Sequence, residues 1–440
     1  MIQRRVFLGG LGAASLSAFQ PRPRPNIVVI LADDLGYGDA GCYGQARIKT
    51  PNIDRLAAEG TRFTQAYAGS TVCAPSRCSL FTGYHTGHAR MRANNEVYLG
   101  KRDVTISEIL HDAGYRTGLF GKWSLGTLGT EGYPNDKGFD EWYGYFSQMH
   151  AHVAYPQLLL HNRGEVNLTG NWGTSRKQFA NDLFTEQAVK FAAGSRQPFF
   201  LHLAYTIPHA DNEEGRDTGN GMVVPSDEPY SKEAWPQQER NFAAMITRMD
   251  GDIGRVLEAC DARNTLVIFT SDNGPHKEGG HSPEFFKSSG PLRGIKRDLY
   301  DGGIRVPSIV RWPGVVGAGK TSDFVWAFWD MLPTLAEVAG TRAPAGLDGQ
   351  SIVPVLTGRE QKPHEYLYWE FHEGGFFQGV RHGKWKAVRK GLGGKLELYD
   401  VAADIGESSN VAAGNPEVVG SIERYLATAR TDDPNFPVKG

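Results

Sequence analysis

Cysteine is scarce and scattered in this chain, which has four cysteines in 440 residues. The four thiols, spread from Cys42 to Cys260, do not have the number expected of a disulfide framework or the spacing expected of a zinc site. We therefore expect one structural disulfide at most.

An excess of charge of either sign is also missing, because the formal net charge is -2. Without a broad basic surface the protein is not expected to bind nucleic acid, and it can recognise anions only locally. No apolar run is long enough to form a stable membrane-spanning helix. The composition, with 54 glycines, is typical of a loop-rich globular protein that is long enough for two domains.

The N-terminal segment differs from the rest of the chain. Arg4 and Arg5 precede a weakly apolar, glycine-rich stretch that ends near Phe19, and this pattern resembles a bacterial twin-arginine export signal. We expect residues 1–25 to be a removed export signal and linker, and the mature protein to be periplasmic or extracellular. A frayed N-terminus is the alternative.

Two regions with different patterns follow. Apolar strands such as residues 26–32 and 265–271 alternate with helices through residues 26–350, which predicts an α/β domain with a large mixed sheet flanked by helices. Residues 351–440 contain short strands separated by glycines and then one helix, which predicts a small α+β domain of antiparallel strands. Residues 123–172 show no clear periodicity and are predicted to form long loops.

Acidic side chains follow two of the predicted strands. Asp33 and Asp34 end the first, and Asp272 and Asn273 end another. Ligands of open α/β sheets bind at the carboxyl ends of strands, so these oxygens could together hold a hard cation, Ca²⁺ or Mg²⁺. Ordinary turn chemistry is the alternative for either cluster alone.

A cysteine occupies the predicted start of a helix. Pro75 suits a first helical turn and Gly83 suits a left-handed stop, so Cys73 is placed at a helix N-terminus. Unpaired N–H groups and the nearby Arg77 would attract an anion there. The alternative is a small buried cysteine that only packs.

Three further basic residues stand in similar contexts. Lys122 and His209 each follow a strand, and Lys296 lies in a glycine-bounded loop. Each alone is more often a surface charge. Together with Arg77, they provide the groups that bind a tetrahedral oxyanion and stabilise its charge.

These residues occur within a set of motifs that carries a family resemblance. The chain resembles the type I formylglycine-dependent sulfatases, the arylsulfatase and carbohydrate-sulfatase family of the alkaline-phosphatase-like superfamily, from about residue 26 to its end. The matching motifs are Cys73-Ala74-Pro75-Ser76-Arg77 with Leu80-Phe81-Thr82-Gly83, Asp33-Asp34, Gly121-Lys122-Trp123, Pro208-His209, Ser271-Asp272-Asn273-Gly274, Gly294-Ile295-Lys296 and Asp301-Gly302-Gly303-Ile304-Arg305-Val306-Pro307.

The resemblance implies a reaction. A formylglycine-generating maturation enzyme would oxidise Cys73 to Cα-formylglycine, and one hydroxyl of the hydrated aldehyde would attack sulfur. Lys122, His209 and Lys296 would hold the sulfate oxygens, and Arg77 would assist the formylglycine and the metal. The metal ligands implied by the resemblance are Asp33, Asp34, Cys73, Asp272 and Asn273.

One position departs from the family pattern. The commonest form is Gly-Lys-Trp-His-Leu-Gly, and Ser124 stands in place of its histidine. Since serine is a poor base at neutral pH, water or another histidine, His150 or His152, is expected to take the proton. These two histidines could instead bind substrate or pack in a loop. The predicted substrate-binding residues are Ser124, His150, His152, Asn95 and His276.

The resulting hypothesis is an exported sulfuric ester hydrolase that removes sulfate from sulfated carbohydrates and acts as an arylsulfatase on artificial aryl sulfate esters. A phosphonate or phosphodiester hydrolase of the same superfamily is one alternative. A glycan-binding relative without activity is another.

Overall fold

The computed structural model describes residues 23–438, and its centre is one sheet of ten strands. This sheet confirms the predicted α/β class with a large mixed sheet. Its strands, in spatial order, are β11 (Lys320–Ser322), β2 (Thr61–Phe63), β10 (Ser308–Arg311), β9 (Thr265–Ser271), β1 (Asn26–Asp33), β8 (Phe199–Pro208), β4 (Arg116–Gly121), β5 (Glu141–Gly144), β6 (Leu158–His161) and β7 (Gly164–Asn167). The strands from β9 to β5 are parallel, and antiparallel neighbours flank them on both sides.

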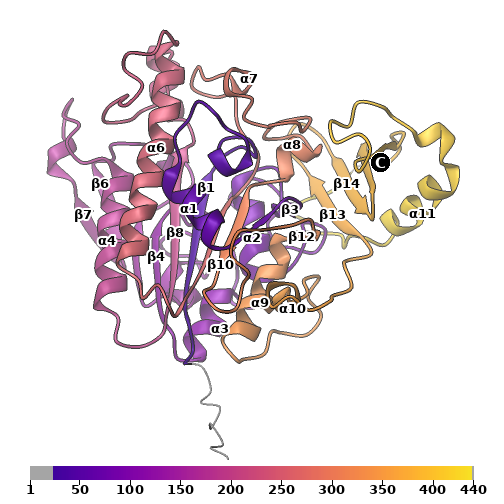
Figure 1. Cartoon of the computed structure of the whole chain (residues 1–440), viewed down its shortest axis with the longest axis horizontal. Coiled ribbons are helices and arrows are strands. Elements are labelled where there is room, and N and C mark those ends of the chain that lie inside the picture. The colour runs from indigo at the N-terminus through magenta and orange to yellow at the C-terminus, as the bar shows by residue number, and fades with distance from the viewer. Residues whose placement is uncertain (1–22, 439–440) are drawn as a thin grey trace, which may run out of the picture.

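Strand β1 lies in the middle of the sheet because its side chains are apolar on both faces. Ile27, Val29 and Leu31 belong to the hydrophobic cluster on one face, and Val28 and Ile30 belong to the cluster on the other. Alternation of side chains along a strand requires this division. A strand with two apolar faces needs a cover on each, which the helices provide (Figure 1).

Three longer helices cover one face of the sheet: α1 (Pro51–Glu59), α4 (Ala180–Gly194) and α6 (Gln237–Glu258). The opposite face carries α2 (Cys73–Thr82), α3 (Ile106–Asp112) and α9 (Met331–Val338). Helix α2 begins at the predicted cysteine and ends before Gly83, whose φ of 78° is the expected left-handed stop. The shorter helices are α5 (Asn212–Thr218), α7 (Pro283–Phe286), α8 (Asp301–Ile304) and α10 (Val353–Leu356).

The prediction of long loops for residues 123–172 is only partly correct. This region contains β5 and the β6–β7 hairpin, which extend the edge of the large sheet. Each of these strands has four residues, which is too short for an alternating pattern to stand out in the sequence.

The C-terminal region contains a second, antiparallel sheet. Its strands are β13 (Leu367–Phe371), β14 (Phe377–His382), β15 (Trp385–Lys390) and β16 (Glu397–Asp400), and they are followed by α11 (Pro416–Leu426). Figure 1 shows this unit beside the large sheet, with α11 on its outer side. The elements match the predicted antiparallel strands and helix, and the division of the chain at residue 350 stays a prediction.

The two faces of the small sheet have different partners. One face packs on α11, and Tyr368 and Ile422 belong to that cluster. The other face packs on the large unit, where Trp369 shares a cluster with Tyr67 and Val72. The Trp369 Nε1–H also donates to the Ala68 carbonyl at 2.9 Å. The small sheet therefore supports the segment that leads directly into Cys73.

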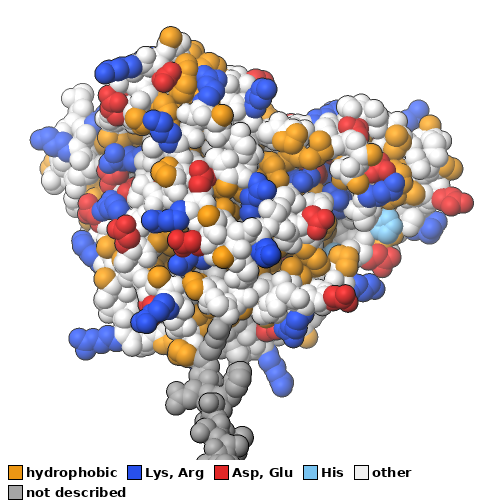
Figure 2. Space-filling model, viewed as in Figure 1, with side chains coloured by type: hydrophobic (Ala, Val, Ile, Leu, Met, Phe, Trp, Pro, Cys, Tyr) orange, Lys and Arg blue, Asp and Glu red, His pale blue; other side chains and the backbone are white. Residues whose placement is uncertain are grey.

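Two sequence-based expectations concern membranes and charge. Within residues 23–438, no helix is both long enough and apolar enough to cross a membrane. The predicted twin-arginine motif lies outside the described residues. Figure 2 shows Lys and Arg side chains interspersed with Asp and Glu side chains over the visible face, as expected for a net charge of -2.

A buried ionic cluster ties the C-terminal sheet to the large unit. Glu370 in β13 accepts hydrogen bonds from Arg92 at 2.7 Å, from Arg430 at 2.9 Å and from the Tyr368 hydroxyl at 2.9 Å. Burial alone would raise the pKa of Glu370, but its hydrogen bond with His372 and the charges of the two arginines lower it to about 2.

Replacing Glu370 with Gln should destabilise the protein, because Arg92 is buried and would lose its counter-charge. We expect the free energy of unfolding to fall by about 3–5 kcal/mol, measured by urea denaturation at pH 7. Since the pKa of Glu370 is lowered on folding, its contribution should be present above pH 4.5 and lost as the pH falls toward 2. Glu365→Gln, an exposed change in the same unit, is the control; equal stabilities of the two variants would contradict the prediction.

Candidate active site

The carboxyl ends of β1 and β9 bring four oxygen-bearing side chains together. Because Ala32 pairs with Ser271 in neighbouring parallel strands, Asp33 and Asp272 follow at the same level of the sheet. The Asp34 N–H donates to Asp272 Oδ1 at 3.1 Å, and Asn273 Nδ2 donates to Asp34 Oδ1 at 2.7 Å. All four side chains are fully buried. The structure thus joins residues that are some 240 positions apart in the sequence, as their strand-end positions predict.

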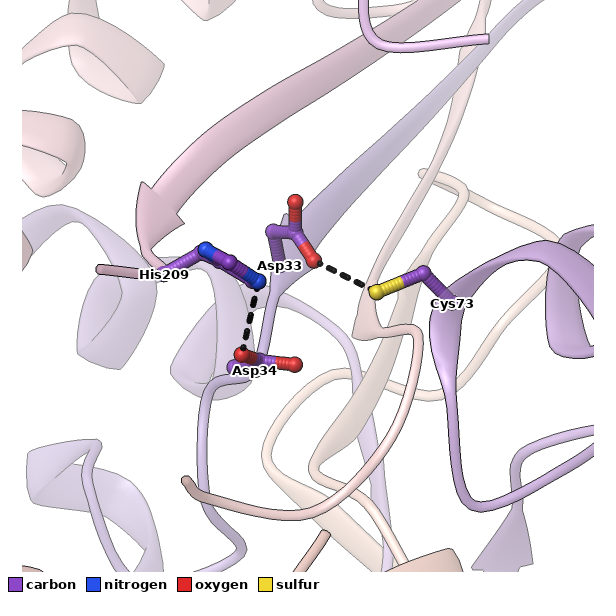
Figure 3. Close-up of side chains that lie close together, drawn as sticks. All are labelled: Asp33, Asp34, Cys73 and His209. Carbon is purple, nitrogen blue, oxygen red and sulfur yellow. Dashed lines mark hydrogen bonds and ion pairs between the residues drawn. The ribbon is translucent and has the colours of Figure 1, made fainter. Parts of the chain in front are cut away.

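Cys73 lies across from this cluster at the first turn of α2 (Figure 3). Its Sγ is 3.3 Å from Asp33 Oδ1, and the residue is 1% exposed. Burial, reinforced by the negative charge of Asp33, raises the pKa of the thiol well above its usual value. The thiol is therefore protonated at neutral pH and donates to Asp33. A protonated, buried thiol is a poor nucleophile.

Each of the three aspartates has a cationic partner. Lys122 Nζ is 2.7 Å from Asp33 Oδ2, and Lys296 Nζ is 2.8 Å from Asp34 Oδ2. Arg77 forms a fork on Asp272, whose Oδ2 accepts from Nε at 3.0 Å and from Nη2 at 2.8 Å. These contacts explain how three carboxylates can be buried side by side.

The negative charges nevertheless strain the cluster. Burial would raise the pKa of Asp33, but Lys122 and the other cations hold it well below its usual value. Burial and then the charge of Asp33 raise the pKa of Asp272 to about 7. In addition, Asn273 Oδ1 is buried without a hydrogen-bond partner in the described chain. Carboxylate oxygens plus one free amide oxygen are the donors that a hard divalent cation prefers, so Asp33, Asp34, Asp272 and Asn273 fit such an ion.

His209 approaches the cluster from the end of β8. Its Nδ1–H donates to the Ala210 carbonyl at 2.7 Å, which leaves Nε2 facing Asp34 at 3.6 Å (Figure 3). Burial and then the charge of Lys296 lower the pKa of His209 well below its usual value. The ring of His152 stacks on His209 with 4.6 Å between centroids.

Three of the predicted substrate-binding residues, His152, His150 and Ser124, differ in their contacts. His152 touches the cluster through His209, whereas the ring of His150 stacks on Phe146 at 4.1 Å. Burial lowers the pKa of both histidines to about 4, so both are neutral at pH 7. Ser124 has a left-handed φ of 72° and a buried hydroxyl without a hydrogen-bond partner in the described chain.

The other two predicted substrate-binding residues lie in different surroundings. His276 is 1% exposed, and its ring bridges the Pro208 carbonyl at 2.9 Å and the Glu278 N–H at 3.0 Å. It therefore ties the loop that follows β9 to the end of β8. Asn95 is exposed and accepts from the Val97 N–H, while its neighbour Asn94 accepts from the Ala74 N–H at 2.9 Å.

Sequence reasoning missed Glu278. Its Oε2 lies 3.4 Å from Lys296 Nζ and 3.7 Å from His209 Nε2. The only signal in the sequence is its position shortly after Asp272-Asn273-Gly274.

Comparison with protein families identifies the fold and its chemistry. The Sulfatase family model matches residues 25–341, and the model described as N-sulphoglucosamine sulphohydrolase, C-terminal, matches residues 295–431. The first of these alone spans most of the chain.

Individual relatives agree. Human arylsulfatase A is 31% identical, with coverage of 96% of this chain and 90% of the relative. The N-acetylgalactosamine-6-O-sulfatase of Bacteroides thetaiotaomicron is 29% identical, with 94% of each protein covered. The crystal structure of Ps i-CgsB superposes with a TM-score of 0.80 at 30% identity, with 92% of each chain covered. The chain therefore belongs to the sulfatase family and is a sulfuric ester hydrolase.

Proposed function

We propose that the protein removes sulfate from sulfated carbohydrates and also cleaves aryl sulfates. The observation that carries this proposal is the buried group of Lys122, Lys296 and Arg77 around Cys73. These three cations balance the three aspartates, so a divalent cation held by the aspartates would leave net positive charge for a small tetrahedral anion. Among the relatives, one is named N-acetylgalactosamine-6-O-sulfatase and one arylsulfatase A. A further similar structure, 29% identical, is a complex with k-i-k-neocarrahexaose.

The proposal includes modification of Cys73 to Cα-formylglycine by a maturation enzyme. The raised pKa of the Cys73 thiol supports it, because the thiol itself is poorly suited to attack sulfur. The hydrated aldehyde would supply a hydroxyl nucleophile and a route for releasing sulfate. Asp33 Oδ1, which now accepts from the thiol, would accept from a hydroxyl at the same position.

The metal in this proposal is Ca²⁺, with Mg²⁺ as the alternative. Asp33, Asp34, Asp272 and Asn273 would hold it together with the modified Cys73, and it would neutralise negative charge on the sulfate group. The unpaired Asn273 Oδ1 supports this assignment. Arg77 keeps Asp272 in place through its two hydrogen bonds.

The chain's own cationic groups have separate roles. Lys122 and Lys296 bind sulfate oxygens and stabilise charge that develops on them. His209 has its Nδ1–H fixed on the Ala210 carbonyl, so Nε2 is directed toward the site. Its lowered pKa leaves Nε2 without a proton at neutral pH, so it would take a proton from solvent when the negative charge of bound sulfate raises that pKa, and would then give it to the departing alkoxide. Asp34 and Glu278, both near Nε2, would stabilise the protonated ring.

We also propose that the protein acts outside the cytoplasm, in the periplasm or the extracellular space. The paired arginines at Arg4 and Arg5 and the weakly apolar stretch after them support export by a twin-arginine route.

Cys73→Ala should abolish sulfate release from 4-nitrophenyl sulfate and from regiodefined sulfated monosaccharides, because it removes the precursor of the nucleophile. Cys260→Ser, at a half-buried cysteine away from the site, should retain activity. Mass spectrometry should show that the Cys73 peptide is lighter than the thiol form. A large preference for phosphate or phosphonate esters would favour the other hydrolase, and a persistent thiol with tight glycan binding would favour the inactive relative.

Calcium should stabilise the protein. At a free concentration one hundred times its dissociation constant, a cation that binds only the folded state adds about 2.7 kcal/mol to the free energy of unfolding. We expect this gain in wild type and a smaller one in Asn273→Ala, with Asn435→Ala as the exposed control. Thermal melting with Ca²⁺, Mg²⁺ and chelator measures it, and equal responses of the three proteins would exclude the cation site.

His152→Ala should lower kcat by roughly 100-fold, the usual effect of losing a residue that transfers protons. His150→Ala should change it less than about threefold, since its ring lies on Phe146 and not on His209. The assay is turnover of 4-nitrophenyl sulfate at saturating substrate. Unchanged turnover in His152→Ala would remove this histidine from the reaction and leave water as the proton acceptor.

A further inference from the structure

A chain of polar side chains leads from the nucleophile helix to the C-terminal unit. Asn94 is its first member, because its Oδ1 accepts from the N–H of Ala74, the residue after Cys73, at 2.9 Å. The Asn94 N–H in turn donates to Glu373 Oε1 at 2.9 Å. Glu373 lies in the connection between β13 and β14, so the small sheet reaches to the start of α2.

The same chain continues to the sulfate-binding groups. Arg297 Nε lies 3.7 Å from Glu373 Oε2, and Arg297 Nη1 lies 2.6 Å from Glu278 Oε1. Glu278 then approaches Lys296 at 3.4 Å and His209 at 3.7 Å. We call Asn94, Glu373, Arg297 and Glu278 the polar arc.

The polar arc is more accessible than the groups it surrounds. Cys73 and Lys122 are 1% exposed and Lys296 is 5% exposed. By contrast, the side chains of Arg297, Glu373 and Glu278 are 49%, 28% and 20% exposed. An ester whose sulfate is held by the buried groups must extend its alcohol part outward. The arc lies next to those groups, because Glu278 approaches Lys296, and its side chains are partly exposed to solvent.

Arg297 is held in a fixed position within the arc. Its backbone has a left-handed φ of 77°, which is uncommon for a residue with a side chain and is often found at functional sites. The backbone N–H donates to the Thr71 carbonyl at 3.1 Å, and the carboxylates of Glu278 and Glu373 hold the guanidinium. Guanidinium donors that these contacts leave free are preorganised for oxygen acceptors.

The charge of the arc indicates what kind of group it accepts. One guanidinium faces two carboxylates, Glu278 and Glu373, so the arc does not offer net positive charge to a second anion. Carboxylates accept hydrogen bonds from hydroxyl groups, and the guanidinium and the Asn94 amide can donate hydrogen bonds to hydroxyl oxygens. This combination suits hydroxyl groups and disfavours an additional sulfate.

We propose that the polar arc binds the uncharged hydroxyl groups of the sugar ring that carries the scissile sulfate. The C-terminal sheet thereby takes part in substrate selection through Glu373. This inference rests on the proposed action on sulfated carbohydrates and adds to it the recognition of the departing sugar.

The test compares Glu373→Gln with wild type on two kinds of substrate. In the variant, a ring hydroxyl of the substrate should lose its hydrogen bond to a charged carboxylate. The value of kcat/KM on the sulfated monosaccharide that wild type prefers should therefore fall by about 10- to 100-fold. For 4-nitrophenyl sulfate, which has no such hydroxyls, the fall should be at least fivefold smaller. Relative activity on a disulfated monosaccharide should rise, because one negative charge has been removed.

Glu365→Gln, an exposed change in the same unit, is the matched control and should behave like wild type on both substrates. Equal losses on the sugar and aryl substrates would show that Glu373 only supports Asn94 and Arg297, and would overturn the proposal. Unchanged kinetics on both would also overturn it. Hydrolysis of the aryl sulfate by wild type, with no activity on any sugar of the panel, would instead overturn the carbohydrate assignment itself, and with it the arc.

Discussion

The parallel pairing of β1 and β9 is the constraint on which the site depends. It places Asp33 and Asp34 beside Asp272 and Asn273 at one edge of the sheet. Three carboxylates buried this closely repel one another, and each of them is paired with one cationic side chain. The positions of Lys122, Lys296 and Arg77 therefore meet a requirement of charge balance in addition to the roles proposed for these residues.

This balance also bears on how the proposed ligands would bind. A cation or a sulfate group entering the cluster would meet charges that are already oriented and already desolvated, so little reorganisation would be needed. Burying these charges destabilises the ionised form of Asp272 in the folded protein, which is why its pKa is raised. Buried apolar residues on both faces of β1 hold the strand, and hence the cluster, against that electrostatic strain.

Much of this arrangement could be predicted from the sequence, because it depends on local patterns. Apolar strands that end in Asp33-Asp34 and in Asp272-Asn273 indicate a shared sheet edge, and the flanking Gly83 marks the end of α2. Contacts formed by irregular segments could not be predicted in this way. Three features depend on how loops fold over the edge of the sheet: the stacking of His152 on His209, the bridging role of His276 and the position of Glu278. Loop conformation leaves no periodic pattern in the sequence from which these contacts could be predicted. The four-residue strands β5 to β7 were missed for the same reason.

The small sheet packs against the segment from Tyr67 to Val72, and this packing bears on when Cys73 becomes buried during folding. All ten residues of α2 are buried, and Cys73 reaches its final surroundings only when Asp33 and Asp272 are in place near it and β13 packs on Val72, the residue before it. Those partners come from the beginning, the middle and the end of the polypeptide. An enzyme that acts on the Cys73 side chain must therefore reach it while the chain is still incomplete or unfolded. The proposed modification of Cys73 would therefore compete with folding, and synthesis of the last strands would close the interval in which it could take place.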